Sequence, residues 1–323
     1  MKKPVRIAVV GAGQFGRNHL RVVAAALPNA ELVAVADSDP DRAKAAAEEF
    51  GIAAMDTGAL AGIADAAIVA VPTSAHAAVG CALLEAGLDV LMEKPIASTL
   101  EEAQQLMDTA ERYGRILQIG HLERFNPAVQ AVSKRITTPL FFEIHRMSLF
   151  SPRSLDVDVV LDLMIHDLDI VLAMVGVFPE EVRAAGIRIL SEKVDIANVR
   201  LAFPGGCVAN ITASRVSTER VRKMRLFQPH QYISMDYQKQ EAVAFSVSPA
   251  QQIGFEAFAI EKNEPLKQEV AAFIDSVVTR AKPLVDGAQG NKALMVALDI
   301  LAKIEDHAAI VAKTLGQAPL SQV

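Results

Sequence analysis

The first third of the chain alternates short, largely apolar runs with longer segments of helical periodicity. The apolar runs predict buried strands at residues 5–10, 31–37, 66–72, 89–95 and 115–121. Between them, amphipathic patterns predict helices at 15–27, 39–51 and 100–114. Strands that alternate with helices in this way indicate an α/β fold with a doubly wound parallel Rossmann sheet.

The pattern changes near residues 121–126, so we divide the chain into domains 1–122 and 123–323. The second half has long, alternating, β-branched segments between Glu181 and Val247, and Pro204-Gly205-Gly206 predicts a hairpin turn. Helical patterns flank them at 126–136, 159–175, 265–281 and 291–308. This half is therefore predicted to be an α/β domain with a largely antiparallel sheet.

One predicted helix, 159–175, carries a polar stripe on an otherwise apolar surface. At about 100° per residue, Asp162, His166 and Asp169 fall within a sector of roughly 60°. Because unpaired buried polar groups are costly, the stripe must have partners. It is either a hydrogen-bonded network in the core or a catalytic face, and a carboxylate–histidine metal site is a third alternative.

Composition limits the partners of the protein. The 323 residues are 51% hydrophobic and 22% charged, with a net charge of −6 and no basic block. We therefore expect neither nucleic acid nor a membrane as a partner. The 19 uncharged residues from Ala66 to Leu84 are interrupted by Pro72 and His76, which indicates strand, turn and helix rather than a membrane span. Two distant cysteines favour a reducing compartment, the cytoplasm.

A glycine motif follows the first predicted strand and opens the first helix. Gly11-Ala12-Gly13-Gln14-Phe15-Gly16 matches G-x-G-x-x-G. In this motif the first glycine permits a tight turn, the second lets the backbone approach a pyrophosphate, and the third allows close helix–strand packing. The helix N-terminus offers unpaired N–H groups to the anion. We expect a dinucleotide site here.

Asp37 ends the second predicted strand, 21 residues after Gly16 and close to the usual spacing of about 20. Its carboxylate should accept hydrogen bonds from ribose hydroxyls and repel a 2′-phosphate. No Arg or Lys occupies positions 38–41. The sequence therefore predicts NAD rather than NADP as the cofactor.

Two further strand ends carry candidate site residues. Ligands bind at the carboxyl ends of strands in open α/β sheets. Glu93 and Lys94 end one strand, and we expect both to contact the cofactor, with Glu93 at the nicotinamide ribose. Lys94 is also expected to reach a substrate hydroxyl. Another strand ends in a stretch expected to line the cofactor channel, Val71, Pro72, Thr73 and His76. For Lys94 a surface ion pair is the alternative, and for His76 a helix cap or a packing residue.

Together, the glycine motif, Glu93-Lys94-Pro95 and the Asp162–His166 pair resemble the Gfo/Idh/MocA oxidoreductases over essentially the whole chain. The resemblance implies that residues 1–122 bind NAD. It also implies that 123–323 form a substrate-binding and oligomerisation domain with an open sheet. It further implies that Lys94, Asp162 and His166 surround a sugar or polyol carbon.

The chemistry implied is oxidation of a secondary alcohol to a ketone. His166 would take the hydroxyl proton as hydride leaves the same carbon, and Lys94 would stabilise the developing alkoxide. Asp162 lies four residues before His166, on the same face of the helix, and would orient the substrate or the histidine. Asp169 would support them. One departure is Met164, where the common form of the family has glycine; the pocket wall is expected to differ there.

Residues 120–129 and 156–171 resemble the UDP-N-acetylglucosamine 3-dehydrogenase branch of this family. That branch implies a 3-keto nucleotide sugar, passed to an aminotransferase on the way to amide-linked lipid A. Arg124 and Arg153 would meet the diphosphate and Asn126 a sugar hydroxyl; the alternatives are an interdomain salt bridge for the arginines and a helix cap for Asn126. A free-sugar or inositol dehydrogenase is the second interpretation, and an NAD-binding regulatory protein without turnover the third.

Overall fold

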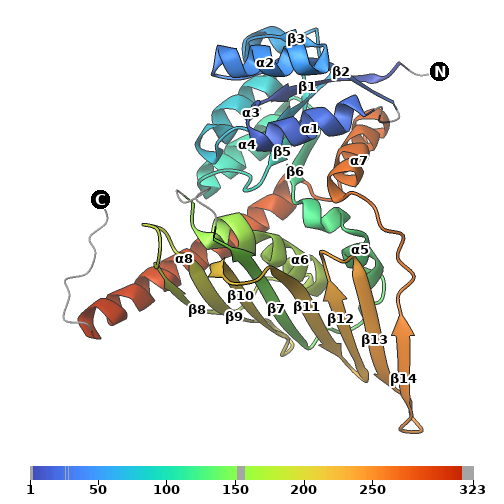
Figure 1. Cartoon of the computed structure of the whole chain (residues 1–323), viewed down its shortest axis with the longest axis vertical. Coiled ribbons are helices and arrows are strands. Elements are labelled where there is room, and N and C mark those ends of the chain that lie inside the picture. Colours follow the sequence, from blue (N-terminus) through green and yellow to red (C-terminus); the bar gives the residue numbers. More distant parts are fainter. Residues whose placement is uncertain (1–2, 26, 28, 151–156, 315–323) are drawn as a thin grey trace. The chain divides into compact units, whose positions relative to one another are not determined.

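The computed structural model describes residues 3–25, 27, 29–150 and 157–314 (Figure 1). The chain forms two compact units. The first contains Met1–Phe125 and Asn263–Leu294, and the second contains Asn126–Lys262 and Met295–Val323. The division expected from sequence, after residue 122, differs from this one because the segment Asn263–Leu294 returns to the first unit.

The first unit is built on a six-stranded parallel sheet with the order β3-β2-β1-β4-β5-β6, which confirms the Rossmann prediction. The strands are β1 (Val5–Val10), β2 (Ala30–Ala36), β3 (Ala53–Ala54), β4 (Ala66–Val69), β5 (Asp89–Glu93) and β6 (Leu117–Gly120). The chain order reverses between β1 and β4, and such a switch point opens a crevice at the carboxyl ends of the strands. The crevice is therefore expected beside Gly11 and Ala70.

Helices cover the apolar strands of this sheet, namely α1 (Gln14–Ala24), α2 (Pro40–Phe50), α3 (His76–Glu85), α4 (Leu100–Arg112) and α7 (Pro265–Thr279). Figure 1 shows α7 beside α1. Leu266, Val270 and Phe273 of α7 belong to the same buried cluster as Ile7 of β1 and Leu20 of α1. This apolar stripe of α7 explains its return to the first unit, since burying it against the sheet removes it from water.

The second unit is built on an eight-stranded sheet with the order β14-β13-β12-β11-β7-β10-β9-β8. Its strands are β7 (Phe141–Leu149), β8 (Glu181–Ile187), β9 (Ile196–Ala202), β10 (Val208–Ser217), β11 (Val221–Gln228), β12 (Gln231–Asp236), β13 (Glu241–Val247) and β14 (Ile253–Ala257). Among the strand pairs that the structure describes in this sheet, β7–β10 alone is parallel. The predicted hairpin is confirmed between β9 and β10, and its turn uses Gly205 and Gly206 at φ values of 86° and 89°.

The helical elements of the second unit are α5 (Pro127–Ser133), the π-helical turn Val160–Met164, α6 (Ile165–Val175) and most of α8 (Gly287–Thr314), which begins in the first unit. Along β7, the side chains of Phe142, Ile144 and Arg146 are buried, while those between them are partly exposed. Such alternation is typical of a sheet with one covered face. No helix in the described residues has the length and apolar character that a membrane crossing requires.

Candidate active site

The glycine loop joins β1 to the N-terminus of α1, and each glycine has the environment that the motif predicts. Gly11 has φ +100°, and a Cβ atom there would lie 2.4 Å from the carbonyl oxygen of Ala70. A Cβ on Gly16 would lie 1.7 Å from the carbonyl oxygen of Gly11. By contrast, no described atom lies within 4 Å of the Cβ position of Gly13. The space beside Gly13 and the helix N-terminus fits the pyrophosphate of a dinucleotide.

Asp37 follows β2 and is bound into the same loop. Its carboxylate accepts hydrogen bonds from the backbone N–H groups of Ala12, at 2.7 Å, and Asp39, at 2.8 Å. The guanidinium of Arg42 lies 3.1 Å from the same side chain. Ala12 thus serves the site through its backbone. Arg42 lies one residue beyond positions 38–41, which contain no Arg or Lys.

A cavity of about 590 Å³ lies at the carboxyl ends of these strands. Seven residues expected to bind the cofactor line it: Gly11, Gly13, Gln14, Phe15, Asp37, Val71 and Pro72. Other residues that line it were not predicted from the sequence, including Ser38, Pro40, Arg42, Asp56 and Thr57. Six expected residues lie outside its lining: Ala12, Gly16, Thr73, His76, Glu93 and Lys94. The cavity therefore fits the adenosine and pyrophosphate half of a dinucleotide.

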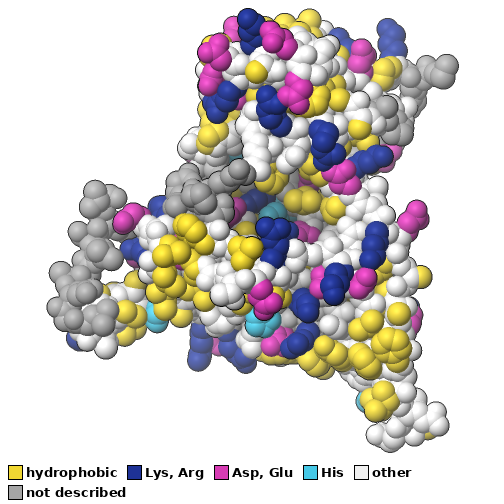
Figure 2. Space-filling view, in the orientation of Figure 1, with side chains coloured by type: hydrophobic (Ala, Val, Ile, Leu, Met, Phe, Trp, Pro, Cys, Tyr) yellow, Lys and Arg dark blue, Asp and Glu magenta, His cyan; other side chains and the backbone are white. Residues whose placement is uncertain are grey.

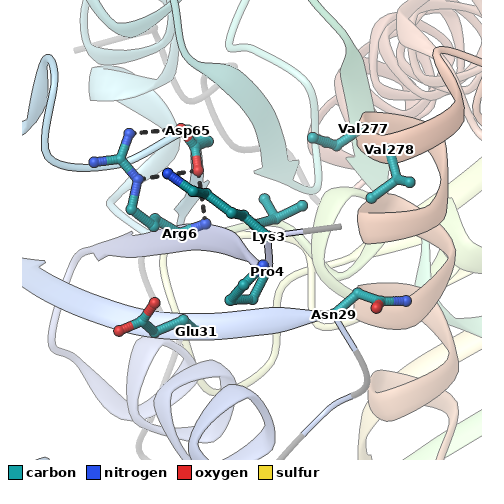
Figure 3. Close-up of a pocket in the computed structure, with 9 residues that line it drawn as sticks. Lys3, Pro4, Arg6, Asn29, Glu31, Asp65, Val277 and Val278 are labelled. Atoms are coloured by element: carbon teal, nitrogen blue, oxygen red, sulfur yellow. Dashed lines mark hydrogen bonds and ion pairs between the residues drawn. The ribbon is translucent and has the colours of Figure 1, made fainter. Parts of the chain in front are cut away.

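A larger cavity of about 680 Å³ lies at the opposite, amino-terminal edge of the sheet (Figure 3). Its charged groups include Arg6 and Asp65, whose side chains bind each other at 2.7 Å, and Val277 and Val278 of α7 close one side. Because α/β sheets bind ligands at the carboxyl ends of their strands, position rather than volume selects the smaller cavity as the cofactor site.

His76 begins α3, and its ring is 1% exposed. Its Nδ1 lies 2.9 Å from the carbonyl oxygen of Pro95, and its Nε2 lies 3.1 Å from that of Val71. Burial lowers the pKa of His76, against the effect of these carbonyls. The ring thus joins the segment after β4 to the segment after β5. Both ring nitrogens face protein carbonyls, which favours a positioning role over the expected contact with the cofactor. Thr73 lies in the preceding 3₁₀ turn.

Glu93 and Lys94 stand at the end of β5, as expected. Glu93 is 8% exposed, and its Oε1 lies 2.6 Å from Nε2 of the buried His19 on α1. Beside them, His121 at the end of β6 is 1% exposed. Burial, followed by the charges of Lys94 and Arg124, lowers the pKa of His121 to about 3. His121 is therefore neutral, and the positive charge at this edge of the sheet belongs to Lys94 and Arg124.

In the second unit, the polar stripe begins in a π-helical turn rather than in a regular α-helix. The N–H of Ile165 donates to the carbonyl of Val160, five residues back. Asp162 lies within this turn and is partly buried, whereas His166 and Asp169 on α6 are buried. π-Helical turns are frequent at functional sites, where they redirect a side chain. In the described structure the donor atoms of Asp162, His166 and Asp169 do not gather within 4.8 Å of one another, unlike those of a metal site.

Asp167, which interrupts the apolar side of α6, has a structural partner. Arg146 of β7 donates to both of its carboxylate oxygens, at 2.7 and 2.8 Å, and the two side chains are at most 2% exposed. The guanidinium also lies 5.1 Å from the ring centroid of Tyr237. This bidentate pair fixes α6 on the sheet, and with it the direction of the neighbouring His166.

The segment that leads into the π-helical turn is held by a second buried pair, Arg215 and Asp195. Arg215 donates to Asp195 at 2.8 Å and to the carbonyl of Val157 at 2.6 Å. Burial acts to raise the pKa of Asp195, but hydrogen bonds, first those from the N–H groups of Ile189 and Leu190, reverse this and lower it. The pair is therefore ionised at neutral pH and anchors the chain before Asp162.

The three residues expected to bind substrate outside the helix differ in their placement. Asn126 caps α5: its Oδ1 accepts from the N–H of Ala128 at 3.0 Å, and its Nδ2 donates to the carbonyl of Tyr237 at 3.0 Å. This favours the helix-cap alternative over a sugar contact. Arg124 is partly exposed near His121, where it can still meet an anion. Arg153 lies outside the described residues.

Comparison with known protein families matches both parts of the chain. Residues 5–121 match the model of the Gfo/Idh/MocA oxidoreductase family, NAD-binding Rossmann fold. Residues 134–228 match the model of the GFO/IDH/MocA C-terminal domain.

Among curated proteins, the chain is 34% identical over 308 residues to UDP-N-acetylglucosamine 3-dehydrogenase from Acidithiobacillus ferrooxidans, covering 93% of this chain and 97% of that protein. A crystal structure of that enzyme superposes with a TM-score of 0.90 over 95% of this chain and 99% of that one. The chain is also 29% identical over 237 residues to scyllo-inositol 2-dehydrogenase (NAD(+)) from Bacillus subtilis, covering 67% of this chain and 69% of that protein.

Proposed function

The chain belongs to the Gfo/Idh/MocA family of NAD-binding oxidoreductases, and we propose that it oxidises C3 of UDP-N-acetylglucosamine to a ketone. The observation that carries this proposal is the similarity to the Acidithiobacillus enzyme, which extends through both units. Similarity to the Bacillus inositol dehydrogenase covers about two thirds of the chain.

We assign the proton chemistry to Lys94, His166 and Asp162. Bound NAD would supply the acceptor for the hydride that leaves the alcohol carbon. His166 takes the hydroxyl proton, so that the C–O bond becomes a carbonyl. Lys94 donates a hydrogen bond to the same oxygen and stabilises the negative charge that develops on it. Asp162 orients the substrate or the imidazole. Glu93, beside Lys94, holds the nicotinamide ribose.

For the nucleotide end of the substrate, we propose the positive edge of the first unit. Lys94 and Arg124 act on the neutral His121 by their charges, so both cations lie near one buried, uncharged ring. A guanidinium matches phosphate oxygens with two parallel hydrogen bonds, which suits Arg124 to the diphosphate. A free sugar or inositol carries no such anion, so Arg124 is the residue on which the two substrate classes should differ.

The assay of substrates decides between these classes. The purified protein is incubated with NAD and, separately, UDP-N-acetylglucosamine, N-acetylglucosamine and scyllo-inositol, and NADH formation is followed by absorbance. We expect turnover with the nucleotide sugar alone, and Lys94→Ala as a control should lower it by about 10²- to 10⁴-fold. Turnover with inositol alone would select the second substrate class. If no NADH forms with any of the three compounds, in a protein that still binds NADH, a regulatory NAD-binding protein would be favoured.

We also propose a homo-oligomer that uses the exposed face of the second sheet. An aromatic row crosses five adjacent strands: the ring centroids of Phe141 and Phe227, Phe227 and Tyr232, Tyr232 and Phe245, and Phe245 and Phe255 lie 4.9 to 5.9 Å apart. Phe245 and Phe255 are 40% and 64% exposed. Figure 2 shows hydrophobic side chains gathered over this part of the sheet. A second copy of the chain would cover them.

Light scattering tests this association. Phe245→Glu should shift the molar mass of the native protein toward the monomer, whereas Glu241→Gln on the same strand should leave it unchanged. A monomeric wild-type protein would refute the proposal.

In the cell, we propose a cytoplasmic enzyme whose 3-keto product is taken by an aminotransferase for amide-linked lipid A. The free thiols of Cys81 and Cys207 fit such a reducing compartment.

A further inference from the structure

Three ionisable side chains from three elements meet in the core of the first unit, beneath the cofactor site. They are His19 of α1, Glu93 of β5 and Glu269 of α7, and their exposed fractions are 0%, 8% and 0%. One polar atom from each lies within 4.8 Å of the others. Such a group in an apolar core requires an arrangement of protons or ions that keeps its charge low.

Only part of this cluster is paired by ordinary hydrogen bonds. His19 Nε2 lies 2.6 Å from Glu93 Oε1. Within the described structure, neither carboxylate oxygen of Glu269 has a hydrogen-bond donor, although its backbone carbonyl accepts from Nε2 of Gln118 at 3.2 Å. The helix that carries Glu269 is packed into the core by Leu266, Val270 and Phe273. The carboxyl group therefore cannot turn to water, and one of its oxygens lies within 4.8 Å of a Glu93 oxygen.

The neighbouring charges oppose ionisation of Glu269. Three elements pack against α7: α1 carries His19, β1 carries Arg6, which is paired with Asp65, and the turn Leu122–Phe125 carries Glu123 and Arg124. Glu93 of β5 has a carboxylate oxygen within 4.8 Å of one of Glu269. Burial is the largest influence and raises the pKa of Glu269 well above its ordinary value of 4.5, and the carboxylate of Glu93 raises it further. Two ionised carboxylates at this separation would repel each other in a medium of low polarity.

A bound cation is the other way to neutralise such a cluster, but the His19–Glu93 distance argues against it. Two ligands held about 2.0 Å from one tetrahedral metal ion lie about 3.3 Å apart. The 2.6 Å between His19 Nε2 and Glu93 Oε1 is the length of a strong hydrogen bond instead.

We propose that Glu269 is a neutral carboxylic acid whose O–H group donates a hydrogen bond to the Glu93 carboxylate. His19 and Glu269 together then hold this carboxylate at the end of β5. Glu269 is thus a positioning residue: it acts on the cofactor site through Glu93 and leaves one negative charge next to Lys94. Gly120 supports the same arrangement, since a Cβ atom there would lie 3.1 Å from Glu93 Oε2. The consequence for the cofactor rests on the role proposed for Glu93, whereas the protonation itself does not.

Infrared spectroscopy tests the protonation directly. The carbonyl stretch of a protonated carboxylic acid is separated from the carboxylate bands. We expect the wild-type protein at neutral pH to show one such band that Glu269→Gln removes. Asp275→Asn, which replaces an exposed carboxylate on the same helix, should leave it in place. If Glu269→Gln folds poorly, Glu269→Met serves as the second variant and should also lack the band. A wild-type spectrum without the band would overturn the proposal.

The pH dependence of unfolding gives an independent readout. The native state keeps the Glu269 proton at pH values where the unfolded chain, with its ordinary value of 4.5, has lost it. Native stability therefore falls as pH rises above that value, by about tenfold in the unfolding equilibrium constant per pH unit, until Glu269 ionises in the native state. Glu269→Gln should lack this component, and its advantage over the wild type should grow with pH. An advantage that is constant with pH would overturn the proposal.

The remaining arms separate positioning from metal binding. Because a glutamine amide also donates to a carboxylate, Glu269→Gln should bind NADH nearly as well as the wild type. Glu269→Met should bind it about tenfold more weakly, as for a lost hydrogen bond to a charged group. Equal affinities of both variants would refute the positioning role. Zn²⁺ added alone should not change the melting temperature. A rise in the melting temperature of the wild type but not of Glu269→Gln would show that the cluster binds a metal ion, and it would overturn the proposed hydrogen bond.

Discussion

The guanidinium of Arg42, in the first turn of α2, lies 3.1 Å from the carboxylate of Asp37, which follows β2. Asp37 is 6% exposed at its side chain and Arg42 is 55% exposed, so the acid is fixed and the base is accessible. An acid at this position binds the ribose hydroxyls of NAD, and a nearby arginine accommodates the 2′-phosphate of NADP. The pair therefore combines one group that favours NAD with one that favours NADP.

Asp37→Ser should therefore change the choice of cofactor. We expect NADH affinity to fall by about tenfold, the loss for a hydrogen bond to a charged group, while NADPH affinity rises because Arg42 is released. The fluorescence of each bound cofactor gives the two dissociation constants. The double variant Asp37→Ser/Arg42→Gln should lose the gain for NADPH. An unchanged ratio of the two constants in Asp37→Ser would contradict the ribose assignment.

Two glycines of the same loop should respond differently to an added methyl group. Gly13→Ala places its Cβ where no described atom lies within 4 Å, so the protein should fold normally and bind NADH more weakly. Gly16→Ala places its Cβ 1.7 Å from the carbonyl oxygen of Gly11, so folding itself should suffer, by several kcal/mol. Thermal unfolding and NADH titration separate the two effects. If Gly13→Ala kept full affinity, the pyrophosphate would have to lie elsewhere.

Local patterns account for what the sequence could predict. The glycine loop, Asp37 and the end of β5 follow directly from strands and their spacing, because the parallel sheet brings their carboxyl ends to one edge. The hairpin β9–β10 follows from adjacent glycines. Each of these depends on residues close together in the chain, and the family resemblance supplied the roles of Lys94, Asp162 and His166.

Features that depend on distant contacts could not be predicted. The return of α7 to the first unit is decided by packing against α1 and β1, and its apolar stripe alone names no partner. Asp167 interrupts the apolar side of α6, and the pattern does not identify its partner, Arg146, which lies 21 residues away. The π-helical turn at Asp162 changes the spacing of the polar stripe, yet a single inserted residue leaves no mark in a hydrophobic pattern.

Replacing Lys94 or His166 with alanine should reduce turnover by about 10²- to 10⁴-fold, the usual contribution of a positioned acid or base. NADH affinity and the melting temperature should stay close to those of the wild type, because neither residue lines the cavity of the glycine loop. Steady-state rates and cofactor titrations on the same preparations give this comparison. A variant that retained the wild-type rate would lose its assigned role.

Arg146→Met should destabilise the second unit. It leaves Asp167, which is fully buried, without its bidentate partner, and breaking one side of a buried ion pair costs about 3–5 kcal/mol. Arg146→Met/Asp167→Leu removes both charges and should recover much of that loss. Chemical denaturation measures the free energies of unfolding. If the double variant were less stable than Arg146→Met, the destabilisation could not be explained by the unpaired charge of Asp167 alone.

Acidification should destabilise the first unit through His121. Its pKa is lowered from 6.5 to about 3 by burial and by Lys94 and Arg124, so below pH 6.5 the unfolded chain binds a proton that the native state refuses. The free energy of unfolding should fall with decreasing pH, by up to about 1.4 kcal/mol per unit, until the native histidine is protonated. His121→Asn removes this slope, whereas His145→Gln, at a side chain 40% exposed, should keep it. Denaturation curves recorded between pH 7 and pH 5 give the free energy of unfolding of each protein. Subtracting the His121→Asn values from those of the wild type removes the contribution of the other titrating groups. Parallel curves for these two proteins would mean that His121 takes its proton in the native state, so that neither its burial nor the charges of Lys94 and Arg124 would disfavour the protonated ring.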